Sequence, residues 1–259
     1  MPVDIVSFIK RDYIHSMAQK GIRMDGRAMD EMRELTVTKP FITSAEGSAK
    51  IQLGDTQVIV GVKIEQGTPF SDRPNMGVLI STAELTPIAS PNFESGPPRP
   101  PAIELARVVD RGVRESETID LAPLCIKEGE KVWMIFIDMH PIDMHGNLFD
   151  ACNYGAMAAL SVAKIPWSKI DESKKDIPLG PRHAPVSITA VKLGNKIMVD
   201  PSMDEEEVAD ARLTVVIDEN DDIRAMQKGL NGAFSIDEVK YVVGLSRDLG
   251  KKIRPKLMD

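Results

Sequence analysis

The sequence predicts an α+β fold built from two similar halves, each an antiparallel-rich sheet with packed helices. Short apolar stretches with polar alternation and turn residues between them fill much of 33–88 and 185–228, as is typical of antiparallel strands. Longer stretches with a period of 3.6 residues accompany both sets of strands and indicate helices. A polar, proline-bearing stretch at 167–184 separates the two sets.

In the first half, periodicity and composition decide between helix and strand. Alternating apolar residues predict a hairpin around Gly54-Asp55, with one side of its second strand facing the core. The stretch 131–142 is apolar almost throughout, which favours a strand covered on both faces. Five prolines make 91–101 a loop. The elements expected here are, in chain order, a helix at 4–20, strands at 33–41, 50–53, 56–64 and 77–88, a helix at 102–117, a strand at 131–142 and a helix at 149–164.

The second half carries clearer local signals. Gly194-Asn195 predicts a tight hairpin turn, and the acidic stretch 218–222 predicts a second turn. Ser235 and Glu238 fit a capping box, so the last helix is expected to start near Ser235. The strands expected here are 185–193, 196–200, 213–217 and 223–228. These limits divide the chain into an N-terminal helix and arm at 1–30, a first half at 31–166, a linker at 167–184 and a second half at 185–259.

Composition excludes several classes of protein. A hydrophobic content of 42% argues against disorder, and a net charge of −7 argues against tight, unaided binding of nucleic acid. Any RNA role must therefore rest on a few placed arginines. No apolar stretch approaches the roughly 18 residues that span a bilayer, and the N-terminus does not resemble a signal peptide. Cys125 and Cys152 lie in apolar contexts that favour buried free thiols, so a cytoplasmic protein with no membrane partner is expected.

An ordered set of short motifs resembles the RNase PH family. The motifs are, in chain order, Arg23-Met-Asp-Gly-Arg27, Gly47-Ser-Ala49, Gly54, Thr56, Val58, Glu104-Leu-Ala-Arg107, Ala122 to Leu124 and the strand-turn-helix at 131–164. The resemblance covers roughly residues 20–255 and implies the RNase PH fold. Two further stretches, Pro101 to Arg111 and Val199 to Glu207, look like the second ring subunit of the archaeal exosome.

This resemblance implies a place in a larger assembly. In that family two related chains alternate in a hexameric ring of three heterodimers, and one of the two carries the phosphorolytic site. RNA is shortened from its 3′ end by inorganic phosphate, and nucleoside diphosphates are released. The implied partners are the catalytic RNase PH-like subunit, RNA-binding cap proteins and single-stranded RNA.

The turn from Gly146 to Asp150 predicts that this chain is not the catalytic one. Phosphate is held by a helix N-terminus with small and basic residues, and active members resembling this chain have a Gly-Ser-Arg type turn there. Here Leu148 and Phe149 offer no hydrogen bonds, and Asp150 would repel phosphate. The alternative is an active phosphorolytic 3′–5′ exoribonuclease whose phosphate is held by other residues, for example Arg182 or His183.

A second position supports the same prediction. Active members carry an Asp beside the apolar strand that starts here near Leu213. In this chain Arg212 stands at that position, and Asp210 lies two residues away. A slip of two residues would move the carboxylate by about 6–7 Å and spoil its contact with the reacting phosphate.

Three arginines of the helix at 102–117 form the candidate RNA-binding face. Arg107, Arg111 and Arg114 share one side of that helix, and the resemblance implies that they reach RNA phosphates at the seam with the catalytic partner. Arg73, in the loop that starts at Gly67, is expected either to line the RNA path or to be a plain surface arginine. The alternative for the helix is a solvated face with ion pairs to Glu104, Asp110 or Glu115. Its buried stripe would be Ile103, Ala106, Val109 or Asp110, and Val113.

Other clusters favour structural interpretations, and neither a metal nor a cofactor is expected. The stretch 218–222 resembles the first ligands of a calcium loop, but Ile223 and Gly229 stand where that loop needs Gly and Glu. His140 and His145 lack the spacing of a helical metal-binding pair. The acidic run 204–207 is expected to be the solvated start of a short helical turn.

Overall fold

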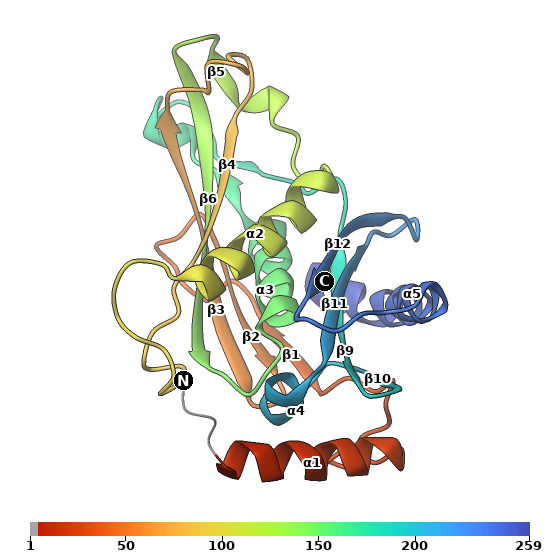
Figure 1. Ribbon diagram of the computed structural model, residues 1–259. Coiled ribbons are helices and arrows are strands. Elements are labelled where there is room, and N and C mark those ends of the chain that lie inside the picture. The colour runs from red at the N-terminus through yellow and green to blue at the C-terminus, as the bar shows by residue number, and fades with distance from the viewer. Residues whose placement is uncertain (1–4) are drawn as a thin grey trace.

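The computed structural model describes residues 5–259, and its first sheet runs along one side of the molecule (Figure 1). Neighbouring strands pair antiparallel except β4 and β6, which are parallel. The strand order is β1 (Leu35–Thr38), β2 (Gly47–Leu53), β3 (Thr56–Gly67), β6 (Lys131–Asp143) and β4 (Val78–Ala83), with β5 (Cys125–Lys127) paired to β6. The predicted hairpin is confirmed, and Val58, Val60, Val62 and Ile64 all face the core.

The second sheet is antiparallel throughout. Its order is β10 (Lys196–Val199), β9 (Val186–Leu193), β11 (Ala211–Ile217) and β12 (Ile223–Gly229). Both predicted turns are confirmed, and Gly194 has the positive φ of +60° that a tight hairpin turn requires.

Helices fill the space between and around the sheets. Helix α3 (Leu148–Val162) contacts β2 and β3 on one side and β9 on the other. It can approach closely because Gly155 has no side chain, since a Cβ there would lie 2.4 Å from Val60 Cγ2. Helix α2 (Pro100–Glu115) packs on β4 and touches β12. Helix α5 (Ile236–Met258) packs on β9 and β11 and begins with the predicted capping box.

The N-terminal helix and the short helix of the acidic run pack together. Helix α1 (Ile5–Gln19) confirms the predicted helix, whose first residue, Asp4, lies outside the described part of the chain. It contacts α4 (Met203–Val208) and covers a small apolar cluster that includes Ile14, Val191 and Met198. In the first half, helix α2 lies between β4 and β5 along the chain. In the second half, α4 lies between β10 and β11. Strands and helices therefore alternate in each half.

The main core is continuous across both halves, because one cluster of buried residues includes side chains from β2, β3, β6, α3, β9, β11 and α5. The linker adds a 3₁₀ turn at Trp167–Lys169 and pairs β8 (Ile177–Pro178) with β7 (Lys164–Ile165). None of the helices within residues 5–259 is long and apolar enough to cross a lipid bilayer.

Four local expectations are wrong. Strand β6 buries Ile135, Ile137 and Met139 on one face only, and its other face is half-exposed. Ile103 is 47% exposed because α2 turns Leu105 and its neighbours inward instead. Cys125 is half-buried because it lies on the short outer strand β5. The fourth strand ends at Ala83, five residues before the predicted end at 88.

Candidate functional site

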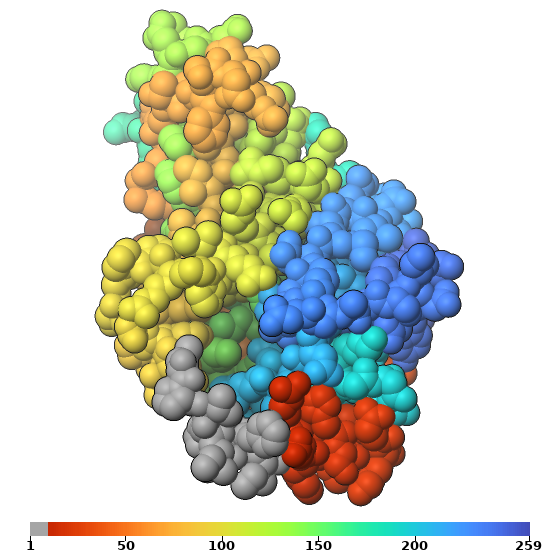
Figure 2. All heavy atoms as spheres, viewed as in Figure 1, coloured from red at the N-terminus to blue at the C-terminus, as the bar shows by residue number. Residues whose placement is uncertain are grey.

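Two exposed arginines and one half-buried arginine lie together on the outer side of α2. Arg107, Arg111 and Arg114 line an open depression of about 300 Å³, together with Asp110 and Glu115. Figure 2 shows this side of α2, in yellow-green, open to solvent beside the blue second half. The expectation that the three arginines share a face is therefore confirmed.

The three arginines differ in how firmly they are held. Arg114 makes two 2.9 Å hydrogen bonds to the Asp110 carboxylate and donates to the Leu79 carbonyl at 2.8 Å, so it clamps α2 to β4. Arg111 Nη1 donates to Gln227 Oε1 at 3.2 Å on exposed surface. Arg107 makes no hydrogen bond or ion pair with any described residue. Arg107 and Arg111 are thus the arginines with donors available to a ligand.

Arg73 lies apart from this depression. It is exposed in the loop between β3 and β4, where its backbone N–H donates to the Phe70 carbonyl at 3.0 Å. It is not among the residues that line the depression on α2.

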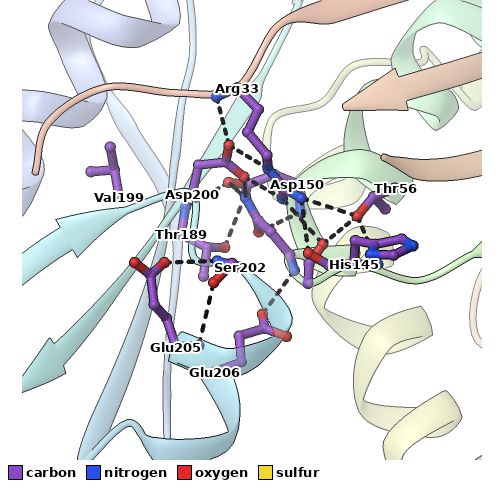
Figure 3. A network of polar contacts seen from close by, with 12 residues as sticks. Arg33, Thr56, His145, Asp150, Thr189, Val199, Asp200, Ser202, Glu205 and Glu206 are labelled. Atoms are coloured by element: carbon purple, nitrogen blue, oxygen red, sulfur yellow. Dashed lines mark hydrogen bonds and ion pairs between the residues drawn. The ribbon is translucent and has the colours of Figure 1, made fainter. Parts of the chain in front are cut away.

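The N-terminus of α3 faces a carboxylate of the chain itself, that of Glu206. Asn147 has a left-handed φ of +56° and caps the helix, and its backbone N–H donates to Glu206 Oε1 at 3.0 Å. Figure 3 labels Glu206 together with Asp150 and Asp200. The segment after Asp200 lies directly on this turn, since a Cβ on Gly146 would sit 2.5 Å from the backbone of 201–203. Burial raises the pKa of Glu206 to about 7.

Asp150 points into the core, so the expectation that it would face and repel a phosphate is wrong. Its carboxylate accepts hydrogen bonds from Ser187 Oγ at 2.8 Å, Thr189 N at 2.8 Å, Thr189 Oγ1 at 2.9 Å and Asn147 Nδ2 at 2.8 Å. The side chain is fully buried, and burial raises its pKa to about 7. Asp150 therefore ties α3 to the second sheet.

Asp200 is the centre of a buried ion-pair network that the sequence did not reveal. Arg33 donates to it from Nη2 at 2.7 Å, from Nε at 2.9 Å and from its backbone N–H at 2.8 Å. Arg27 Nη1 and Asn147 Nδ2 donate at 3.1 and 2.7 Å. Burial alone would raise the pKa of Asp200, but the hydrogen bonds and charge of Arg33 hold it below its usual value.

The acidic run at 204–207 is only partly solvated, contrary to expectation. Glu205 is buried and pairs with Arg23, whose Nε and Nη2 donate at 2.9 and 2.6 Å. Asp204 pairs with Lys10 of α1. A sequence signal existed for this turn, because Ser202 followed by Glu205 is a capping-box pattern, and the structure contains that capping box.

Arg212 and Asp210 have separate structural roles. Arg212 Nη2 donates to Glu104 Oε1 at 2.6 Å, and its guanidinium lies 4.0 Å from the centre of the Phe149 ring. Asp210 pairs with Arg11 at 3.1 Å and accepts the backbone N–H of Gly194 at 2.7 Å. These contacts hold the Asp210 carboxylate to α1 and the β9–β10 turn.

Most of the residues that the sequence offered for an alternative phosphate site or a metal site already pair with neighbouring side chains. Arg182 pairs with Asp120, and His183 Nδ1 lies 2.6 Å from Glu219 Oε1. His183, Asp218 and Glu219 are close enough to share a cation, but Asp218 already accepts Arg224 Nε at 2.7 Å. The expected turn at 218–222 is present. His140 and His145 contact different carboxylates, on Glu84 at 3.7 Å and Asp143 at 3.1 Å.

Comparison with known proteins decides the family. Residues 31–166 match the 3′ exoribonuclease family, domain 1, and residues 183–248 match domain 2. The chain belongs to the 3′ exoribonuclease, or RNase PH, family. It is 51% identical to "Exosome complex component Rrp42" of Methanocella arvoryzae, over 99% of this chain and 98% of that protein. The protein of the same name from Thermoplasma acidophilum is 48% identical over 98% of this chain and 96% of its own length.

Solved structures confirm the predicted RNase PH fold. A chain of the Archaeoglobus fulgidus exosome with RNA bound to the active site matches with a TM-score of 0.93 and 47% identity, over 98% of this chain and 99% of that chain. A chain of an archaeal exosome core matches with a TM-score of 0.91 and 44% identity, over the full length of both.

Proposed function

We propose that this chain is a non-catalytic ring subunit of an exosome, which scaffolds a catalytic RNase PH-like partner and contributes arginines to RNA binding. The observation that carries the proposal is the occupied N-terminus of α3. An anion at this terminus would lie beside the Glu206 carboxylate, which already accepts the Asn147 N–H and would repel it. The next two residues, Leu148 and Phe149, add no side-chain donors, and the Arg212 guanidinium that stacks on Phe149 already donates to Glu104.

The 3′ exoribonuclease family and the relatives named as exosome components support the assembly. In this proposal three copies of the chain alternate with three copies of the catalytic subunit in a hexameric ring, which RNA-binding cap proteins cover. The ring degrades single-stranded RNA from its 3′ end in the cytoplasm. We also propose an arm at 1–30, a first half at 31–166, a linker at 167–184 and a second half at 185–259. The family matches at 31–166 and 183–248 support the start of each half and the end of the first. The continuous core implies that the halves fold together.

The first prediction tests where the chemistry takes place. The sample is the ring of this chain and its partner, with the phosphate-binding loop of the partner disabled, and the substrate is an end-labelled oligoadenylate with inorganic phosphate. We expect no release of nucleoside diphosphate, because the N-terminus of α3 faces the Glu206 carboxylate and its turn, Gly146 to Asp150, carries no basic side chain. Clear release would show that this chain holds a phosphorolytic site of its own, and the intact ring is the positive control.

The second prediction concerns the arginines, of which we propose Arg107, Arg111, Arg114 and Arg73 as RNA-binding. Arg107→Ala and Arg111→Ala should each weaken RNA binding by the ring about tenfold at low salt, as expected for a lost charge-assisted hydrogen bond. Each should also reduce the slope of log affinity against log salt by about 0.7. The charge of Arg114 is largely neutralised by Asp110, so Arg114→Ala should have a smaller effect on RNA and also lower the melting temperature.

Fluorescence anisotropy with labelled oligoadenylate, in a salt series without phosphate, measures both quantities. Arg247→Ala is the control, because this arginine lies on α5 and contacts the carbonyl of Asp221. Equal affinity of the Arg107 and Arg111 variants and the intact ring at every salt concentration would refute the RNA role of α2.

A further inference from the structure

Arg212 lies where α2, α3 and the second sheet meet. It is the second residue of β11, its guanidinium stacks on Phe149 of α3, and it donates to Glu104 of α2 at 2.6 Å. The space for it is narrow, since a Cβ on Gly229 of β12 would lie 2.7 Å from Arg212 Nη2. The Arg212 side chain is 14% exposed, and that of Glu104 is 40% exposed. Arg212 therefore contacts Glu104 from the protein interior, and the Glu104 carboxylate remains partly exposed at the surface.

Glu104 belongs to the same helix face as the two arginines with available donors. Residues three and seven positions apart on a helix lie on one side, so Glu104, Arg107 and Arg111 form one stripe along α2. Besides the exposed Glu115, an unpaired Glu104 carboxylate would be a second negative charge on this face of α2 and would repel the phosphates that the arginines attract. The hydrogen bond from Arg212 neutralises this carboxylate and directs it toward the second sheet.

We propose that Arg212 is a positioning residue of the RNA-binding surface. It acts through Glu104, whose negative charge it cancels. This inference rests on the proposed RNA role of Arg107 and Arg111. Arg212 itself lies behind Glu104, and the chemical partner that this surface accepts is the phosphodiester backbone of single-stranded RNA.

Four variants of the assembled ring separate this role from a general effect on folding. They are Arg212→Met, Arg212→Lys, Glu104→Gln and the double variant Arg212→Met with Glu104→Gln. Affinity for labelled oligoadenylate is measured without phosphate at low and high salt, and the melting temperature is recorded for each ring. Arg224→Met is the matched control, because Arg224 lies on the same β-hairpin but pairs with Asp218.

The expected pattern has a definite sign for each variant. Arg212→Met should weaken binding about 3- to 10-fold at low salt and less at high salt, because it leaves Glu104 charged. Glu104→Gln should bind about as tightly as the intact ring or up to about threefold more tightly. The RNA affinity of the double variant should return to within about twofold of that of the intact ring, even where its melting temperature stays low. Arg212→Lys should also bind within about twofold of the intact ring, because lysine keeps the positive charge. Arg224→Met should bind like the intact ring.

Two results would overturn the inference. Unchanged affinity in Arg212→Met would mean that Glu104 does not need its partner. A double variant as weak as Arg212→Met would mean that Arg212 acts by another route, such as the stability of the α3 turn. If Arg107→Ala and Arg111→Ala also leave affinity unchanged, the proposed RNA function fails. If they weaken binding while Arg212→Met does not, only the role of Arg212 fails.

Discussion

Replacing Asp200 with Asn is expected to lower the free energy of unfolding by about 3–5 kcal/mol, the range measured when one partner of a buried ion pair is removed. Asp200 is fully buried and accepts hydrogen bonds from Arg33, Arg27 and Asn147. Asn keeps the shape and tolerates the left-handed φ of +47°, so the substitution isolates the charge. It leaves two guanidinium groups facing a neutral amide, and urea unfolding followed by circular dichroism measures the loss.

The loss should depend on pH in a definite direction. Because Arg33 holds the pKa of Asp200 below its usual value of 3.8, the ionised carboxylate stabilises the fold above that value. This contribution disappears as the pH falls through the lowered pKa of the folded state, so Asp200→Asn and the intact chain should converge in strong acid. Asp237→Asn is the control, because Asp237 is exposed on α5 and should leave the unfolding curve unchanged. Equal free energies of unfolding for Asp200→Asn and the intact chain at neutral pH would show that the ion pairs of Asp200 do not stabilise the fold.

Local signals explain why most of the fold could be predicted. The hairpin at Gly54, the turn at Gly194 and the capping box at Ser235 each depend on residues a few positions apart. Errors occur where a neighbour far along the chain decides the outcome. The outer face of β6 includes Met134, Phe136 and Ile142 yet is half-exposed, because α3 covers the inner face of the sheet.

The candidate site was less predictable for the same reason. Arg33 and Asp200 are 167 residues apart, and neither belongs to a pattern with a known spacing. The sequence does place Arg107, Arg111 and Arg114 on one side of a helix, since only helical geometry is needed. The sequence does not show which arginine is fixed by other residues. Arg114 is fixed because Ser81 of β4 donates to Asp110, and the carbonyl of Leu79 in the same strand accepts a hydrogen bond from Arg114. The direction of Asp150 likewise depends on β9, which supplies Ser187 and Thr189.

The second large effect concerns Asp150, whose replacement by Asn should remove a loss of stability that develops as the pH rises. Burial raises the pKa of Asp150 from 3.8 to about 7 in the folded chain. As the pH rises above about 4, the unfolded chain loses this proton while the folded chain keeps it, so the folded state loses stability. The loss levels off above about pH 7, and at 1.36 kcal/mol per unit it amounts to about 4 kcal/mol. Asp150→Asn should therefore gain stability relative to the intact chain between pH 4 and pH 7.

Urea unfolding of both chains at intervals from pH 4 to pH 8 measures this difference, in which contributions from titrating groups that do not interact with Asp150 cancel. Two interactions oppose the effect of burial on the pKa of Asp150. They are the four hydrogen bonds that its carboxylate accepts and the positive end of the α3 dipole, and both favour the charged form. A difference that stays flat over this range would mean that they outweigh burial and keep Asp150 ionised. A difference that grows toward pH 7 would mean that the folded chain carries a proton at the N-terminus of α3. Glu206→Gln distinguishes the two carboxylates there, because the pKa of Glu206 is also raised to about 7 and each group disfavours the charge of the other.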